Sequence, residues 1–204
     1  MLTEVHGFDD ARPIGDDDPA MDIIDAGSEA IERWYLETAE SIENFVTADY
    51  PLVAAALRTI RREGLATGEV FCELGCGFGV VAAVAAGEGW ESMGVEIEPT
   101  LVEQARQLCE GLGLPVDLLR GSFVPRHDER LESLSSEVAN VSTDPDDVWA
   151  EASRGPDQVD LYFAFPWPGE EHFFEAFVDS NAAVGSLLMT YRGREGIRVQ
   201  RKTD

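Results

Sequence analysis

The sequence has almost no lysine. Lys202 is the only one, against fourteen arginines and 40 acidic residues, and the formal net charge is −25. So acidic a surface repels the phosphates of nucleic acids, and no basic stripe interrupts it. We therefore expect no nucleic-acid partner. The composition fits a salty habitat or a GC-rich genome, and it does not separate the two.

Long apolar runs are also missing. None reaches the roughly 18 residues that a membrane helix needs. The N-terminal stretch MLTEVHGFDDARPIGDDD has neither the basic nor the apolar region of a secretory signal. Three cysteines, Cys72, Cys76 and Cys109, fit a reducing compartment, and without a second cysteine pair or a nearby histidine they predict no zinc site. We expect a cytoplasmic protein with no membrane segment and no metal.

The 204 residues, 44% of them hydrophobic, suit one globular domain. Residues 1–27 are rich in Asp, Gly and Pro, which predicts a flexible acidic arm or, alternatively, a lid that orders over substrate. The domain itself is expected over 28–204. An acidic stretch at 126–158 is long for a connection and is read as an insertion with short helices at 129–139 and 146–153.

Periodicity predicts alternating helices and strands. Apolar residues at three- and four-residue spacing indicate helices at 28–47, 51–63, 80–87, about 99–110 and around 173–178. Short apolar runs indicate strands at 70–74, 93–97, 116–119, 159–164 and 186–191. The alternation predicts an α/β fold with a doubly wound, mostly parallel sheet and N-terminal helices.

The glycine pattern after the first of these strands carries the most chemistry. Glu73-Leu74-Gly75-Cys76-Gly77-Phe78-Gly79 places glycines at alternate positions, where the backbone can turn sharply and approach a ligand closely. Glu96 stands about twenty residues further on, at the tip of the second strand, where an acid can accept hydrogen bonds from ribose hydroxyls. Together they predict a nucleoside-containing cofactor.

The segments VFCELGCGFGVVAAVAA and GVEIEPTLVEQAR resemble the cofactor motifs of class I, Rossmann-like S-adenosylmethionine-dependent methyltransferases. The resemblance implies that Glu73 and the loop of Gly75, Cys76, Gly77 and Gly79 meet the methionine part of S-adenosylmethionine. It further implies that Glu96 holds the ribose and that Ile97 lies against the adenine. The product would be S-adenosylhomocysteine.

Other positions depart from that family. Ser122 stands where the family commonly has an acid for the adenine amino group, and Phe123 beside it is expected to pack on the purine. Phe165 replaces the polar residue of nucleobase-methylating enzymes, which disfavours that reaction. Phe165, Trp167 and Tyr50 either line the methyl-transfer pocket or belong to the core. The acceptor is expected to be a small molecule or a protein side chain.

Two other functions stay open. The spacing Gly77-x-Gly79-x-x-Ala82 also satisfies a nicotinamide-dinucleotide fingerprint, but Glu73 would repel a pyrophosphate. A cofactor-binding protein without transfer activity is the other alternative.

The C-terminus predicts a shortened sheet. The family has seven strands, whereas only thirteen residues follow Tyr191 here, with one strand-like alternation at 197–200. We expect five parallel strands in the order 3-2-1-4-5 and at most one further antiparallel strand, which would form a sheet edge.

Overall fold

A computed structural model describes residues 1–8, 11–38, 45–126, 128–135, 138, 141–142, 148–150 and 152–204. Seven strands form one sheet in the order β1-β7-β6-β5-β2-β3-β4. Their bounds are Leu2–Glu4 (β1), Val70–Leu74 (β2), Glu91–Glu96 (β3), Val116–Arg120 (β4), Leu161–Ala164 (β5), Leu187–Tyr191 (β6) and Ile197–Lys202 (β7).

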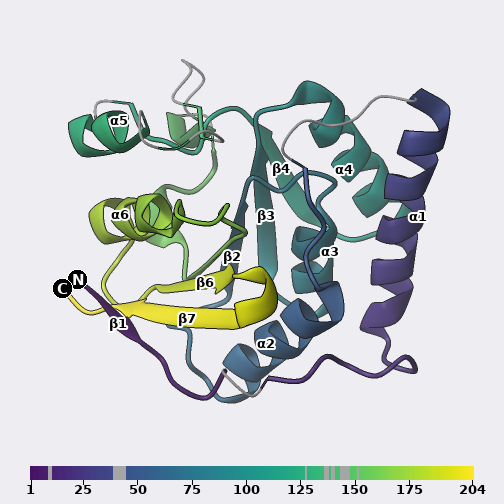
Figure 1. The fold of residues 1–204 in the computed structure, drawn as a ribbon, viewed down its shortest axis with the longest axis horizontal. Helices are drawn as coiled ribbons and strands as arrows, with labels where there is room; N and C mark the ends of the chain where they lie inside the picture. The colour runs from purple at the N-terminus through teal and green to yellow at the C-terminus, as the bar shows by residue number, and fades with distance from the viewer. Residues whose placement is uncertain are drawn as a thin grey trace.

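Helices cover both faces of this sheet, as Figure 1 shows. One side carries α1 (Ala20–Thr38), α2 (Tyr50–Arg62), α3 (Val80–Gly87) and α4 (Pro99–Leu112), and the other carries α5 (Glu129–Ser135) and α6 (Glu171–Asn181). Short 3-10 turns occupy Val148–Ala150, Pro156–Gln158 and Gly193–Glu195. The sheet therefore separates two apolar cores, one on each face.

The parallel part of the sheet is as predicted. β2 pairs in parallel with β3 and β5, β3 with β4, and β5 with β6, which gives the order 3-2-1-4-5 in sequence numbering. β2 lies at the centre, and β2 and β5 are almost wholly buried because helices lie on both sides. The carboxyl ends of these strands meet at one edge, where ligands bind in such sheets.

The antiparallel edge differs from the prediction. β7 pairs antiparallel with β6, as expected, but β1 pairs antiparallel with β7 on its outer side, with Thr3 opposite Arg201. The sheet is thus not shortened: β1, from the start of the chain, supplies a seventh strand and covers the edge that residues 197–200 were expected to form. β1 runs in the same direction as the five parallel strands because two antiparallel pairings separate it from them.

The N-terminal stretch also corrects the predicted arm at 1–27. Besides β1, residues 20–27 belong to α1, whose buried Gly27 would place a Cβ only 2.7 Å from the Val80 side chain. Helix α1 therefore starts eight residues before the predicted position 28, and residues 45–47 are not helical. The end of the predicted helix at 39–44 lies outside the described residues.

Several local predictions are confirmed. The Asp49 side chain accepts a hydrogen bond of 3.0 Å from the Leu52 amide and caps α2, with Pro51 in its first turn. The insertion at 126–158 contains α5, which packs on α6, and the 3-10 turn at Val148–Ala150. Residues 138, 152 and 153 are not helical, so the predicted helices at 129–139 and 146–153 are too long, and their other positions lie outside the described residues.

Candidate functional site

A cavity of about 520 Å³ lies at the carboxyl ends of the parallel strands. Every predicted site residue except Gly79 lines it, namely Tyr50, Glu73, Gly75, Cys76, Gly77, Glu96, Ile97, Ser122, Phe123, Phe165 and Trp167. The fold brings these residues together because β2, β3, β4 and β5 all end at this edge. Its volume is typical of a site for a small organic ligand.

The glycine loop turns back on itself between β2 and α3. Gly75, Gly77 and Gly79 have φ angles of 76°, 53° and 70°, which residues other than glycine rarely adopt. A Cβ on Gly75 would meet nothing within 4 Å, so this stretch of backbone is open to a ligand. Gly79 faces away from the cavity, with its Cβ position 2.9 Å from Ala105, and it precedes the first residue of α3.

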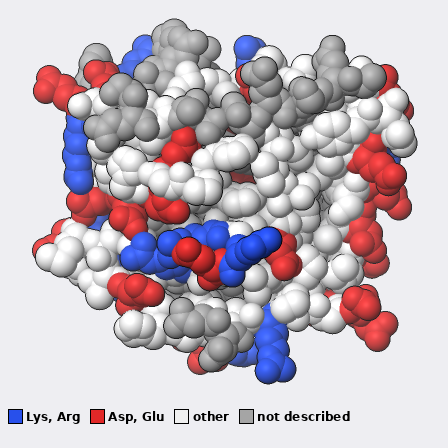
Figure 2. Space-filling model, viewed as in Figure 1, with Lys and Arg blue, Asp and Glu red and all other residues white. Residues whose placement is uncertain are grey.

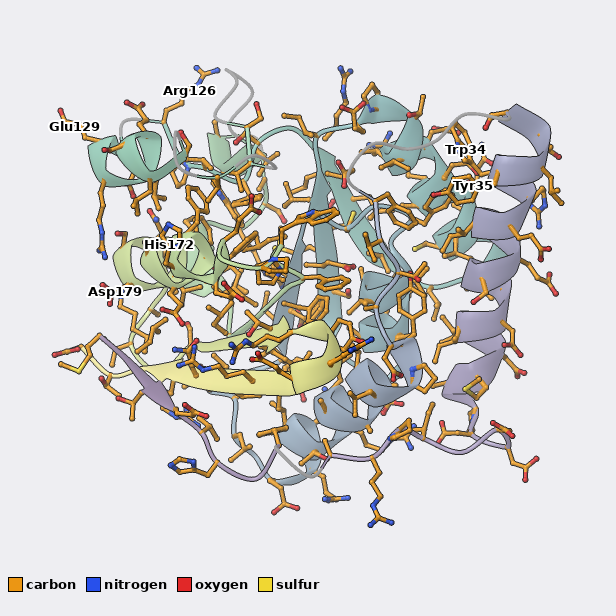
Figure 3. All side chains as sticks on the ribbon, viewed as in Figure 1. Trp34, Tyr35, Arg126, Glu129, His172 and Asp179 are labelled. Atoms are coloured by element: carbon orange, nitrogen blue, oxygen red, sulfur yellow. The ribbon has the colours of Figure 1, made fainter. Side chains whose placement is uncertain are left out.

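An aromatic row supports the loop from behind. Phe78 is buried, and its ring centroid lies 5.1 Å from Phe45 and 6.3 Å from Trp34 of α1. Figure 3 shows Trp34 and Tyr35 on α1, on the flank of the α3–α4 layer. A Cβ on Gly77 would lie 2.7 Å from the Phe45 ring. The loop is therefore fixed by packing as well as by its glycines.

Glu73 ends β2 with its carboxylate against the start of α3. It is 6% exposed, and its Oε2 accepts a hydrogen bond of 2.8 Å from the Ala82 amide. Oε1 accepts none from any residue in the described ranges. Burial raises the pKa of Glu73 well above its usual range. The hydrogen bond from the Ala82 amide lowers this pKa, and the negative charge of Glu96 raises it further. A cation in the cavity would compensate the buried charge.

Glu96 joins the glycine loop to the turn before α4. Its Oε2 accepts a hydrogen bond of 2.8 Å from Gly77, and Oε1 accepts bonds of 2.8 and 3.0 Å from the amides of Ile97 and Glu98. Burial raises the pKa of Glu96, and these three amides oppose the rise. Because a carboxylate has about four acceptor positions, one remains for a ligand.

The end of β4 places Ser122 and Phe123 on the cavity lining. Ser122 lines the cavity, but its hydroxyl donates to the Ser142 carbonyl at 2.6 Å and accepts from the Val124 amide. Phe123 stacks on Phe174 of α6 with centroids 5.8 Å apart. The serine therefore holds residues 141–142 against the site, and only part of the Phe123 ring faces the cavity.

Aromatic residues form the wall beyond β5. Phe165 meets Tyr191 edge to face with centroids 4.8 Å apart, and Trp167 is 40% exposed at the rim. Tyr50, the first residue of α2, is 9% exposed and lines the same cavity. Burial, and then the charge of Glu73, raises the pKa of Tyr50.

The hairpin between β6 and β7 adds residues that the sequence did not reveal. Arg192 and Glu195 line the cavity, and a guanidinium nitrogen of Arg192 lies 2.6 Å from a carboxylate oxygen of Glu195. The Nε of Arg192 lies 4.0 Å from a carboxylate oxygen of Glu171. Figure 2 shows basic side chains gathered in a band over β6 and β7, with acidic ones beside them. Phe45 and Glu170 are likewise unpredicted lining residues. No local motif marks them, because they come from separate parts of the chain.

Comparison with known proteins identifies the fold. Residues 72–155 match the family model described as a methyltransferase domain. The resemblance predicted from the glycine loop is thereby confirmed. No protein with a curated description matches the sequence.

Solved structures share the fold of this chain at low identity. A methyltransferase from Geobacter sulfurreducens has a TM-score of 0.53 and 16% identity, with 93% of this chain and 92% of that one covered. An RNA methyltransferase from Salinibacter ruber with bound S-adenosyl-L-homocysteine has a TM-score of 0.51 and 18% identity, and the match covers 78% of this chain and 93% of that one. An O-methyltransferase from Bacillus cereus, also with that ligand, has a TM-score of 0.52 and 15% identity. The match covers 81% of this chain but only 65% of the Bacillus cereus protein.

The described ranges contain no group of three or more His, Cys, Asp or Glu side chains placed to hold a metal ion. In the same ranges, no helix has both the length and the apolar character needed to cross a bilayer.

Proposed function

We propose that this protein transfers a methyl group from S-adenosylmethionine to a small-molecule or protein side-chain acceptor. The observation that carries the proposal is the pair of buried carboxylates, Glu73 and Glu96, at the ends of adjacent strands with the glycine loop between them. Both face one cavity of suitable size. The methyltransferase domain match supports the same reaction.

The residues present fit this cofactor. Its methionine part carries an ammonium group and a sulfonium, and the buried side chain of Glu73 offers an Oε1 that the described residues leave without a hydrogen bond. Gly75 lets the backbone approach closely, since a Cβ there would point into open space. The amino-acid part therefore belongs between Glu73 and the loop.

The nucleoside part fits the end of β3. Glu96 keeps one acceptor position for a ribose hydroxyl after its three backbone bonds. Ile97 leaves 37% of its surface exposed on the cavity rim, an apolar area that adenine would cover. Ser122 donates to the Ser142 carbonyl and accepts from the Val124 amide, so one acceptor position of its hydroxyl remains for the adenine amino group.

When bound, the cofactor supplies an activated methyl group. The protein's part is to hold the acceptor in line with that group and to keep water away. Phe165 and Trp167 from the wall beyond β5, and Tyr50 from the start of α2, surround the acceptor and exclude water. A site of low polarity also favours a reaction in which a positive charge on sulfur is lost.

Nucleic acid is disfavoured as the acceptor, although one similar structure is an RNA methyltransferase. Among the described lining residues, six glutamates face the cavity and Arg192 is the only basic side chain. Phosphates would approach such a surface against its charge. The three free, buried thiols agree with a cytoplasmic location.

Two measurements test the proposal. Calorimetry with S-adenosylmethionine and with NAD should show binding of the first alone, and assays with candidate acceptors should then release S-adenosylhomocysteine. Preference for NAD, or binding of neither, would overturn the assignment. Tight binding without turnover on any acceptor would identify a cofactor-binding protein that lacks transfer activity.

A further inference from the structure

We propose that the acceptor is an aliphatic amine, which arrives as an ammonium cation and is held by Tyr50 and by the carboxylates that line this end of the cavity, at the start of α6 and in the β6–β7 hairpin. This inference rests on the proposed methyl transfer. It names the chemistry of the acceptor, which neither the family match nor the similar structures specify.

The acceptor has a definite place in the cavity. Glu73, the glycine loop and Glu96 occupy the ends of β2 and β3, where the cofactor fits. The remaining wall comes from the ends of β5 and β6 and the start of α2. We define the acceptor end of the cavity by Tyr50, Phe165, Trp167, Glu170, Arg192 and Glu195.

The charge of this end favours a cation. Arg192 carries its only positive charge among the described residues, and that charge is already paired with Glu195 at 2.6 Å and lies 4.0 Å from Glu171. The Nε of Arg192 has no hydrogen-bond partner among the described residues, but an acceptor carboxylate or phosphate there would add a third negative charge beside Glu195 and Glu171. An ammonium group gains from the excess of carboxylates instead.

Tyr50 supplies an independent observation. Its side chain is nine-tenths buried and lines the cavity, yet its hydroxyl makes no hydrogen bond with any residue in the described ranges. Because the hydroxyl lies on a residue of the cavity lining and has no partner among the described residues, it is available to a polar group of a ligand there. The phenol oxygen can accept an N–H from the amine, which leaves the nitrogen lone pair free to face the methyl group.

Aromatic rings at the same end suit a cation as well. Phe165 packs edge to face on Tyr191, and Trp167 is 40% exposed at the rim. Ring faces attract ammonium groups electrostatically. An oxygen acceptor such as a phenol would have to lose its proton first, and the negative charge of the neighbouring carboxylates opposes formation of the phenolate.

The reaction balances with these groups alone. The ammonium first gives a proton to water, and the neutral nitrogen then attacks the methyl carbon. The N–C bond forms with the nitrogen lone pair as the C–S bond breaks, and the sulfur keeps the electron pair of that bond. The positive charge passes to the methylated nitrogen, which later releases a second proton to solvent.

The first experiment compares acceptor probes after calorimetry has shown that S-adenosylmethionine binds. S-adenosylhomocysteine release is followed with 1,4-diaminobutane, Nα-acetyl-lysine amide, catechol and succinate. We expect at least one amine to react roughly tenfold faster or more than catechol or succinate, with a rate that rises with pH as the amine loses its proton. The diamine and the lysine derivative distinguish a free polyamine from a protein side chain.

Two outcomes would overturn the amine proposal while leaving methyl transfer intact. One is equal or faster reaction with catechol or succinate. The other is cofactor binding without any reaction of either amine. Failure of the cofactor to bind would instead reject the proposed function itself, so the two failures are distinguishable.

Variants test the named groups. Tyr50→Phe keeps the ring and should lower kcat about tenfold or more with the preferred amine, while the cofactor Kd stays within roughly twofold. Glu195→Gln should raise the KM for the amine about fivefold, because a negative charge is lost. Glu110→Gln, an exposed change on α4, is the matched control and should alter neither. Full kcat in Tyr50→Phe, or an unchanged KM in Glu195→Gln, would contradict the assignment.

Discussion

Glu96 performs two tasks with one carboxylate. Three of its acceptor positions hold the amides of Gly77, Ile97 and Glu98, and the remaining one faces the cavity. The side chain thus fixes the glycine loop to the next turn while presenting an acceptor to the ligand. Its removal should affect the shape of the site and the contact with the ribose together.

We expect Glu96→Ala to weaken S-adenosylmethionine binding by about 1.5–3 kcal/mol, the usual range for hydrogen bonds to a charged group. Calorimetry measures the change, with the exposed Glu110→Ala as control. An unchanged Kd in Glu96→Ala would mean that another residue holds the ribose.

Gly77 is the loop position at which a side chain should be least tolerated. A Cβ would lie 2.7 Å from the Phe45 ring, and the φ of +53° adds backbone strain. We expect Gly77→Val to abolish cofactor binding. Gly64→Val is the control, because Gly64 has a similar φ of +61° with nothing within 4 Å. Gly64→Val should lower the Tm and leave the cofactor Kd unchanged. Wild-type cofactor affinity in Gly77→Val would reject the loop as the binding site.

The raised pKa of Glu73 predicts how cofactor binding depends on pH. Because burial raises this pKa above 4.5, the group stabilises the fold fully below that pH, and its contribution is lost as the pH rises through the folded-state pKa. A bound cation offsets the ionised form. The rise in Tm caused by S-adenosylmethionine should therefore be larger at pH 7.5 than at pH 5, and Glu73→Gln should reduce the difference. Equal rises at both pH values would show that Glu73 does not face the cation.

At the scale of elements, local pattern explains which parts of the fold the sequence predicts. The strands β2 to β6 are short apolar runs between turns, and their order follows from the alternation with helices. β1 gives no such signal, because Leu2-Thr3-Glu4 is short and its partner lies near residue 201. The start of α1 was missed because Asp22, Asp25 and Gly27 interrupt its apolar pattern.

The candidate site divides in the same way. Glu73, Gly77 and Glu96 could be predicted because the first two belong to one continuous glycine motif after β2 and the third is the last residue of the next strand. Arg192 and Glu195 could not, because the short β6–β7 hairpin reaches the cavity only once the sheet has formed. Tertiary contacts between distant segments leave no periodic mark on the sequence.

The edge strand β1 should contribute measurably to stability. The Val5 amide donates a hydrogen bond of 2.8 Å to the Val199 carbonyl and extends the β1–β7 pairing. Val5→Pro removes this donor and should cost about 1–3 kcal/mol of unfolding free energy. Val5→Ala keeps the amide and serves as control in urea titrations. If both variants unfold at the same urea concentration, the pairing beyond Glu4 adds nothing to stability.

For the whole molecule, charge is the dominant property. The net charge of −25 is spread over 204 residues, and positive charges such as Arg58, paired with Asp18 and Glu88, neutralise only a few acids. Exposed ion pairs contribute little to stability, whereas the excess of like charges repels itself in the compact state. Folding thus proceeds against a repulsion that salt can screen.

We expect the Tm at pH 7.5 to rise when KCl is increased from 0.05 to 1 M, because the screening length falls to about 3 Å and the repulsion among carboxylates weakens. The same titration near pH 4.2, the isoelectric point of the sequence, is the internal control. There the net charge is close to zero, so screening acts mainly on attractive pairs and the Tm should stay constant or fall. Differential scanning fluorimetry at low protein concentration records both series. An equal rise at both pH values would point to a general salting effect on apolar burial rather than to relief of repulsion.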